Sequence, residues 1–237
     1  MKYYGLFSGG KDSLVTCHYM WQKGELDDVV YCRTGIGLDE NVDFVKSTCK
    51  KYNWNLNIVE PKIGETYEDF VRRFGFPHSG AHNMIMGFLK WHPLRKFARD
   101  HKDEDFMFVS GRRQKESKRR MRIAKSQHEE PEKNMKFYSP LLYWSTKDVW
   151  QYVKDNELEI CPVYETLHMS GDCLCGAFAE LGEAELIATF HGYMANKIKT
   201  LEEKYKDKWG NNSSMCGAMK QGKIVDFICN ECIRGGD

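Results

Sequence analysis

The chain has 237 residues, 41% of them hydrophobic and 29% charged, which is the balance of a soluble globular protein with a substantial core. Its formal charge of +1 gives no overall attraction to nucleic acid or to an anionic membrane, so any such binding needs a local patch. No apolar run approaches the ~20 residues of a membrane span, and Lys11 and Asp12 interrupt any signal-peptide pattern. We therefore expect a cytoplasmic protein with no membrane partner.

Strand and helix signals alternate through the first half of the chain. The predicted strands are 3–7, 29–32, 55–59 and 105–109. The predicted helices are 14–21, 39–52 and most of 64–101. This order predicts a doubly wound α/β domain with a mostly parallel, five-stranded sheet. Further along, the polar segment 126–136 is predicted to be a mobile loop and a candidate lid, and Ser145 or Thr146 is predicted to cap another helix.

The most informative stretch joins the first strand to the first helix. It consists of Ser8, Gly9, Gly10, Lys11, Asp12 and Ser13. The two glycines let the backbone approach a phosphate closely, and the amides at the helix start point toward it. Lys11 adds a positive charge and the serines add hydroxyl donors. Asp12 does not attract phosphate, but it suits a magnesium ligand or a helix cap.

A second group of candidate ligand-binding residues follows two other predicted strands. Thr34 and Gly35 come after strand 29–32, at the edge of a parallel sheet where ligands collect. Gly111, Arg112 and Arg113 come after strand 105–109 and open a strongly basic run. Such a run is usually a solvated helix face. Directly after a buried strand, however, guanidinium groups can bind phosphate or sulfate through paired hydrogen bonds.

Nine cysteines are many for a cytosolic chain, and four of them form two close pairs. The pairs are Cys173 with Cys175, and Cys229 with Cys232. Four converging thiolates suit tetrahedral zinc or an iron–sulfur cluster. Disulfides, reduced thiols and a redox-active pair stay open as alternatives, as does the participation of Cys161 or Cys216. We predict a nucleotide-binding domain at 1–160 and a helical cysteine module at 161–237 packed on it.

Three segments carry a resemblance to a known family. Ser-Gly-Gly-Lys-Asp-Ser resembles the PP-loop of the adenine nucleotide alpha hydrolase (HUP-like) superfamily. The stretch from Gly111 to Ser117 resembles the Gly-x-Arg-x-x-x-Glu-Ser segment of its phosphoadenosine phosphosulfate (PAPS) reductase-like branch, one residue tighter if Arg113 is the matching arginine. The segment 140–150 is similar to a Pro- and Trp-containing segment of the same branch, to which we assign no catalytic role.

The resemblance implies an enzyme that binds ATP, cleaves it between the α and β phosphates and releases pyrophosphate, leaving an adenylated substrate for sulfur transfer. The implied catalytic residues are Lys11, Asp12, Arg112 and Arg113. The implied nucleotide-binding residues are Ser8, Gly9, Gly10, Lys11, Asp12, Ser13, Thr34, Gly35, Gly111, Arg112, Glu116 and Ser117. Asp12 or Glu116 would hold Mg²⁺. The resemblance also favours a [4Fe–4S] cluster over Zn²⁺ at the cysteines.

Two alternatives stay open. A genuine PAPS or adenosine phosphosulfate (APS) reductase would use the cysteine of a C-terminal Glu-Cys-Gly-(Leu or Ile)-His tail, of which only Glu231 and Cys232 are present here. A nucleotide-sensing or nucleic-acid-associated module with little turnover would instead use the basic run to contact tRNA or DNA. The oligomeric state is open too, with a homodimer among the options.

Overall fold

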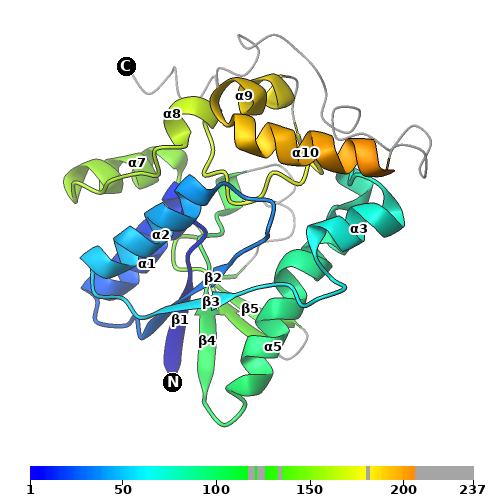
Figure 1. The fold of residues 1–237 in the computed structure, drawn as a ribbon. Helices are drawn as coiled ribbons and strands as arrows, with labels where there is room; N and C mark the ends of the chain where they lie inside the picture. Colours follow the sequence, from blue (N-terminus) through cyan, green and yellow to red (C-terminus); the bar gives the residue numbers. More distant parts are fainter. Residues whose placement is uncertain (117–120, 122–125, 133–134, 180–181, 206–237) are drawn as a thin grey trace. The chain divides into compact units, whose positions relative to one another are not determined.

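The structure is a computed structural model that describes residues 1–116, 121, 126–132, 135–179 and 182–205 (Figure 1). Its chain forms two compact units. Unit 1 comprises Met1–Cys32, Val42–Val59 and Leu94–Cys161. Unit 2 comprises Arg33–Asn41, Glu60–Pro93 and the described residues from Pro162 onward. The sequence suggested a single division near residue 160, whereas in the structure two earlier segments group with the C-terminal part of the chain.

Unit 1 is built on a six-stranded sheet of order β3-β2-β1-β4-β6-β5. The strands are β1 (Lys2–Leu6), β2 (Asp28–Cys32), β3 (Leu56–Val59), β4 (Phe106–Val109), β5 (His128–Glu132) and β6 (Met135–Tyr138). Five strands run parallel, and β5 pairs antiparallel with β6. The prediction of a doubly wound, mostly parallel sheet is confirmed, and the antiparallel β5 adds one strand to the five that were predicted.

Strand β5 lies where the sequence predicted a mobile loop and lid, so that prediction is wrong for these residues. Its ladder with β6 shifts register between Glu129 and Glu132, around Pro131. A proline lacks the N–H that a ladder needs, but it is tolerated at a bulge in an edge strand. The polar composition that suggested a loop is thus also compatible with the outermost strand of a sheet.

Among the described residues of unit 1, four α-helices accompany the sheet. They are α1 (Lys11–Gln22), α2 (Asp39–Lys51), α5 (His92–Asp100) and α7 (Thr146–Asp155). Helices α2 and α5 each cross a boundary between the units, and a short 3₁₀ turn, η3 (Gln114–Glu116), follows β4. The predicted cap of α7 is confirmed: Ser145 Oγ accepts from the Asp148 amide, and the Asp148 carboxylate accepts from the Ser145 amide. Phe7, buried just after β1, packs edge-on against Phe44 and Trp54.

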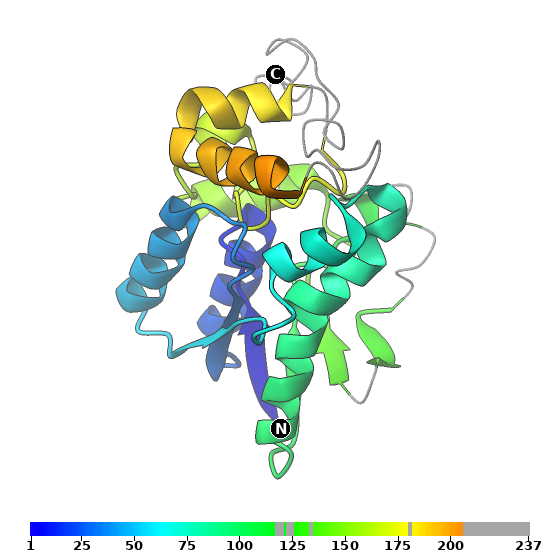
Figure 2. The ribbon, with the colours of Figure 1, turned by 45° about the vertical axis from the view of Figure 1, so that its right-hand side comes forward.

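The regular secondary structure of unit 2, within the residues that the structure describes, is all helical and is joined by loops. Its elements are α3 (Tyr67–Phe74), the 3₁₀ turn η1 (Ser79–Ala81), α4 (His82–Met86), the π-helical turn η2 (Gly87–Trp91), α8 (Tyr164–Leu167), α9 (Glu183–Phe190) and α10 (Gly192–Tyr205). Helices α9 and α10, yellow to orange in Figures 1 and 2, lie side by side. Within the described residues, we find no helix with the length and apolar character of a bilayer span.

Candidate nucleotide site and thiol site

The turn between β1 and α1 has the backbone geometry that the predicted anion cradle requires. Gly9 has φ +81°, in the left-handed region that favours glycine. The Ser13 hydroxyl donates to the Gly10 carbonyl at 2.8 Å and accepts from the Ser8 amide at 3.2 Å, which fixes the turn onto the helix. The first intrahelical bond runs from the Leu14 amide to the Gly10 carbonyl. Amides in a first helical turn have no acceptor within the helix, so an anion in this turn can accept from them.

Gly111 brings the turn after β4 directly against the start of α1. A Cβ atom at Gly111 would lie 2.8 Å from both the Asp12 carbonyl carbon and the Ser13 nitrogen, closer than side-chain carbons pack. The Ser110 amide donates to the Tyr138 carbonyl at 2.8 Å, which joins the ends of β4 and β6 at the same place. Gly111 therefore lies against the cradle, within unit 1.

A buried Arg113 and a partly exposed Asp12 form an ion pair at this edge. The Arg113 side chain is 2% exposed, and its Nε donates to Asp12 Oδ1 at 2.5 Å. Its Nη1 lies 3.4 Å from both the Trp144 carbonyl oxygen and Thr146 Oγ1. Lys11 Nζ lies 3.4 Å from Asp12 Oδ2, so the carboxylate sits between two cations.

This arrangement bears on two predicted roles. A magnesium ligand needs carboxylate oxygens that can reach the metal, but both Asp12 oxygens face cations of the protein. Asp12 therefore does not fit as a magnesium ligand here. Arg113 is directed at Asp12 rather than at open space, whereas Arg112 is half-buried. The side chain of Glu116 and the whole of Ser117 lie outside the described residues, so their predicted roles stay predictions.

In unit 2, the loop after β2 pairs with the loop that carries Cys173 and Cys175, which we call the thiol loop. The hydrogen bonds, each 2.9 Å, run from Thr34 Oγ1 to the Asp172 carbonyl, from the Leu38 amide to the Gly171 carbonyl and from the Leu174 amide to the Ile36 carbonyl. Gly37 is required at the crossing, because a Cβ there would collide with the Asp172 carbonyl oxygen. Thr34 is therefore occupied in holding the two loops together, while Gly35 is exposed.

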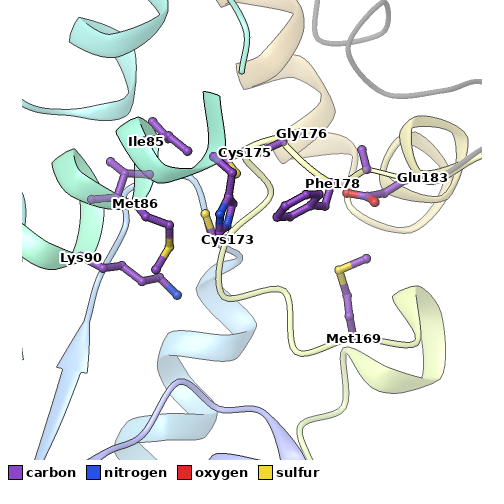
Figure 3. Close-up of a pocket in the computed structure, with 13 residues that line it drawn as sticks. Ile85, Met86, Lys90, Met169, Cys173, Cys175, Gly176, Phe178 and Glu183 are labelled. Atoms are coloured by element: carbon purple, nitrogen blue, oxygen red, sulfur yellow. The ribbon is translucent and has the colours of Figure 1, made fainter. Parts of the chain in front are cut away.

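Cys173 and Cys175 line a cavity of about 230 Å³ in unit 2 (Figure 3). Its apolar wall includes Ile85, Met86, Leu89, Met169, Ala177 and Phe178. Lys90 also lines the cavity, and its Nζ donates to Asp172 Oδ2 at 2.5 Å. The Tyr67 hydroxyl donates to the Cys175 carbonyl at 3.1 Å. The thiols are thus partly exposed groups on a loop anchored from several sides.

The two thiols differ in acidity. The hydrogen bond that Cys173 donates, together with the nearby Lys90 ammonium, lowers the pKa of Cys175 to about 7. The same hydrogen bond, together with burial, raises the pKa of Cys173 well above its usual value. Burial also raises the pKa of Cys17 and of Cys49, as expected for cysteines of the core. Of the two thiols, Cys175 therefore loses its proton at the lower pH.

A family model for the phosphoadenosine phosphosulfate reductase domain matches residues 2–186. The chain belongs to this family. The prediction of a PAPS reductase-like member of the adenine nucleotide alpha hydrolase superfamily is confirmed, and family members include enzymes such as APS reductases.

Individual relatives agree with this assignment. An uncharacterized protein of Methanocaldococcus jannaschii is 28% identical over 86% of this chain and 40% of its own length. Adenosine 5'-phosphosulfate reductase 1 of Bacillus subtilis is 25% identical over 70% of this chain and 69% of its own. The crystal structure of a PAPS reductase from Candida auris aligns with a TM-score of 0.54 at 19% identity, covering 70% of this chain and 77% of that one, which supports the fold. The chain spans less than half the length of the first curated relatives.

The described residues of this PAPS reductase-like chain include two of the four predicted cysteine ligands. Cys173 and Cys175 fit as two thiolate ligands, because they are adjacent, partly exposed and open to a cavity. No cluster of three or more His, Cys, Asp or Glu side chains suited to a metal occurs in the part that the structure describes. Cys229 and Cys232, like Cys216, lie outside those residues, so the four-cysteine site stays a prediction.

Sequence reasoning did not find the residues that support the thiol loop. Asp172 and Lys90 form an ion pair across 82 positions of the chain, and no local pattern signals such a contact. The pairing of the two loops was equally hidden. In retrospect Gly37 and Gly171 carried a signal, since glycines in two loops allow close backbone approach, but nothing in the sequence matched one with the other.

Proposed function

We propose that this PAPS reductase-like protein binds ATP, cleaves it between the α and β phosphates and adenylates a substrate in a sulfur-transfer reaction. The observation that carries the proposal is the pairing of the thiol loop with the loop after β2. Loops at the carboxyl ends of parallel strands form the ligand sites of such sheets. The loop after β2 is one of these loops, and its hydrogen bonds hold the loop that carries Cys173 and Cys175 next to it. Family membership supports an adenine nucleotide as the ligand.

The proposed reaction needs positioning and charge neutralisation more than a nucleophile on the protein. An oxygen of the acceptor forms a bond to the α-phosphorus while the bond to the bridging oxygen breaks, and pyrophosphate leaves with the electron pair. The α1 amides and the Ser8 hydroxyl would hold phosphate oxygens. Lys11 and Arg112 would offset the negative charge that develops. Thr34 would act indirectly, by fixing the loop that presents the exposed Gly35 to the nucleoside.

The thiols would hold the metal centre. In this proposal Cys173 and Cys175 supply two ligands of a [4Fe–4S] cluster, with Cys229 and Cys232 as the other two and Zn²⁺ as the alternative metal. A cluster would supply a soft site for sulfur chemistry. The proposed location is the cytoplasm, where thiols stay reduced. The proposed acceptor is a small molecule or a base of tRNA or DNA.

The test is pyrophosphate release from ATP by the full chain, purified anaerobically and analysed for iron, sulfide and zinc. We expect Lys11→Met to lower the rate by about 100-fold. Lys23→Met is the matched control, because Lys23 flanks the opposite end of the same helix and its loss leaves the cradle intact. Absence of ATP binding by the wild-type chain would overturn the proposal, and a protein with neither iron nor zinc would overturn its metal centre.

A second candidate is sulfonucleotide reduction, favoured by the likeness to the APS reductase of Bacillus subtilis. It would release sulfite from APS or PAPS in the presence of a thiol reductant. Cys232→Ser would abolish sulfite release while leaving the iron content unchanged, if Cys232 is the reacting thiol. Sulfite without pyrophosphate would favour the reductase, and pyrophosphate without sulfite would favour adenylation. Neither product, with binding of nucleic acid that weakens steeply with salt, would favour a module with little turnover.

A further inference from the structure

We propose that Arg113 is a positioning residue, which acts on a bound phosphate through Asp12 and does not contact the phosphate itself. The inference rests on the proposed use of the α1 cradle for the phosphates of a nucleotide. It departs from the role that the sequence suggested, in which Arg113 clamps a phosphate. The difference matters, because each role predicts its own response to substitution of the two residues.

The burial of Arg113 is the first observation. Its side chain is 2% exposed, and a buried guanidinium is costly unless an anion compensates it. Asp12 is that anion, at 2.5 Å from Nε. The contacts of Nη1 with the Trp144 carbonyl and Thr146 Oγ1 reach the start of α7. One buried side chain thus joins the start of α1, the turn after β4 and the start of α7.

The placement of Asp12 is the second observation. It is the second residue of α1, so its amide belongs to the first turn that forms the cradle, and its side chain is 21% exposed. Thr16 Oγ1 donates to the Asp12 carbonyl at 2.8 Å, and Gly111 packs against the same peptide unit. Contacts with Thr16 and Gly111 therefore hold the backbone of Asp12, and Arg113 holds its side chain.

Charge explains why this hold matters for ligand binding. A carboxylate at the edge of an anion site repels phosphate unless a cation neutralises it. Arg113 donates to Asp12 Oδ1, and Lys11 Nζ lies 3.4 Å from Oδ2, so the two cations together neutralise the carboxylate that lies beside the cradle amides. Removal of Arg113 alone takes the nearer of the two cations from Asp12 and leaves the carboxylate beside the phosphate with only the longer Lys11 contact among the residues that the structure describes. Removal of both Arg113 and Asp12 takes away the carboxylate that repels the phosphate together with the cation that neutralises this carboxylate.

The experiment is a double-mutant cycle on the full chain with Arg113→Met, Asp12→Asn and the double variant. The probe is inorganic pyrophosphate, measured by calorimetry, with ATP as the second ligand. We expect Arg113→Met to weaken pyrophosphate binding by at least about 10-fold in the wild-type background. In the Asp12→Asn background, we expect the same substitution to change binding by less than about 3-fold. A phosphate clamp would instead lose the same factor in both backgrounds, and that result would overturn the proposal.

Two further arms keep the result decisive. Arg113→Gln also removes the positive charge but keeps a polar side chain, and it replaces Arg113→Met in the cycle if the methionine variant does not fold. Adenosine, which carries no phosphate, should bind all variants equally. If pyrophosphate binds with the expected coupling but ATP is not cleaved, the proposed function fails while the role of Arg113 stands. A wild-type chain that does not bind pyrophosphate would overturn the role of Arg113.

Discussion

Substitution of Gly111 by alanine should disturb the anion cradle through a steric contact alone. The added Cβ would lie 2.8 Å from the Asp12 carbonyl carbon and the Ser13 nitrogen, whereas ordinary contacts begin at 3.4 Å. The turn after β4 and the start of α1 must therefore separate by about 0.6 Å (3.4 − 2.8 Å) to restore an ordinary contact. Overpacking of this kind typically costs about 1–3 kcal/mol of unfolding free energy. A displacement approaching ~1 Å at a site can cost about 100-fold in function, so we expect pyrophosphate to bind about 10- to 100-fold more weakly.

The assay is urea unfolding followed by calorimetric titration with pyrophosphate on the same samples. Gly192→Ala is the matched control, because Gly192 opens α10 and a Cβ there meets nothing within 4 Å. We expect this control to keep the wild-type stability and affinity. Wild-type values of both quantities for Gly111→Ala would refute the reasoning, since they would mean that the turn accepts a side chain without moving α1.

Three other changes test the rest of the molecule. Gly37→Ala places a Cβ against the thiol loop and should lower the unfolding free energy by about 1–3 kcal/mol, whereas Gly87→Ala, with open space around it, should not. Thr66→Ala removes the cap of α3 and should cost about 1 kcal/mol at neutral pH. The Thr66 hydrogen bond lowers the pKa of Asp69 below its usual 3.8, so this stabilisation is present above 3.8 and lost as the pH falls toward the depressed value. In metal-free protein, alkylation of Cys175 should rise with pH through a midpoint of about 7.

Each of these three has a result that contradicts it. Equal stability of the Gly37 and Gly87 variants would mean that the two loops are not in contact. If the unfolding free energy depends on acid pH in the same way with and without Thr66, the capping box does not stabilise α3 through Asp69. Alkylation of Cys175 with the midpoint of an ordinary thiol, as measured by peptide mass spectrometry, would show that Cys173 and Lys90 do not stabilise the thiolate.

Local patterns explain why much of the fold could be predicted. The apolar strands, the Gly-Gly turn and the Ser145 cap each depend on residues within a few positions of one another. The order of strands and helices then restricts the topology, because parallel strands need crossover connections. Strand β5 escaped detection, since an edge strand with Pro131 has the composition of a loop.

Long-range contacts explain what could not be predicted. The sequence placed Asp12 and Arg113 at one edge but gave no reason for them to pair with each other across 101 positions. Their basic and acidic character suggested contacts with phosphate and metal, which are the usual partners of such groups at a ligand edge. The pairing of the loops around Thr34 and Asp172 spans 138 positions and depends on backbone groups that every residue carries. Composition holds no information on such contacts.

Each unit consists of separate stretches of the chain, and this constrains the order in which the units can fold during synthesis. Unit 1 has its last residue at Cys161, so it can be complete soon after that residue leaves the ribosome, whereas unit 2 has to wait for α10. Until then, segments 33–41 and 60–93 have been synthesised without the partners they pack against. Because the later-made residues supply those partners, we expect a chain released early, for example after Cys161, to expose apolar surface and to depend on chaperones.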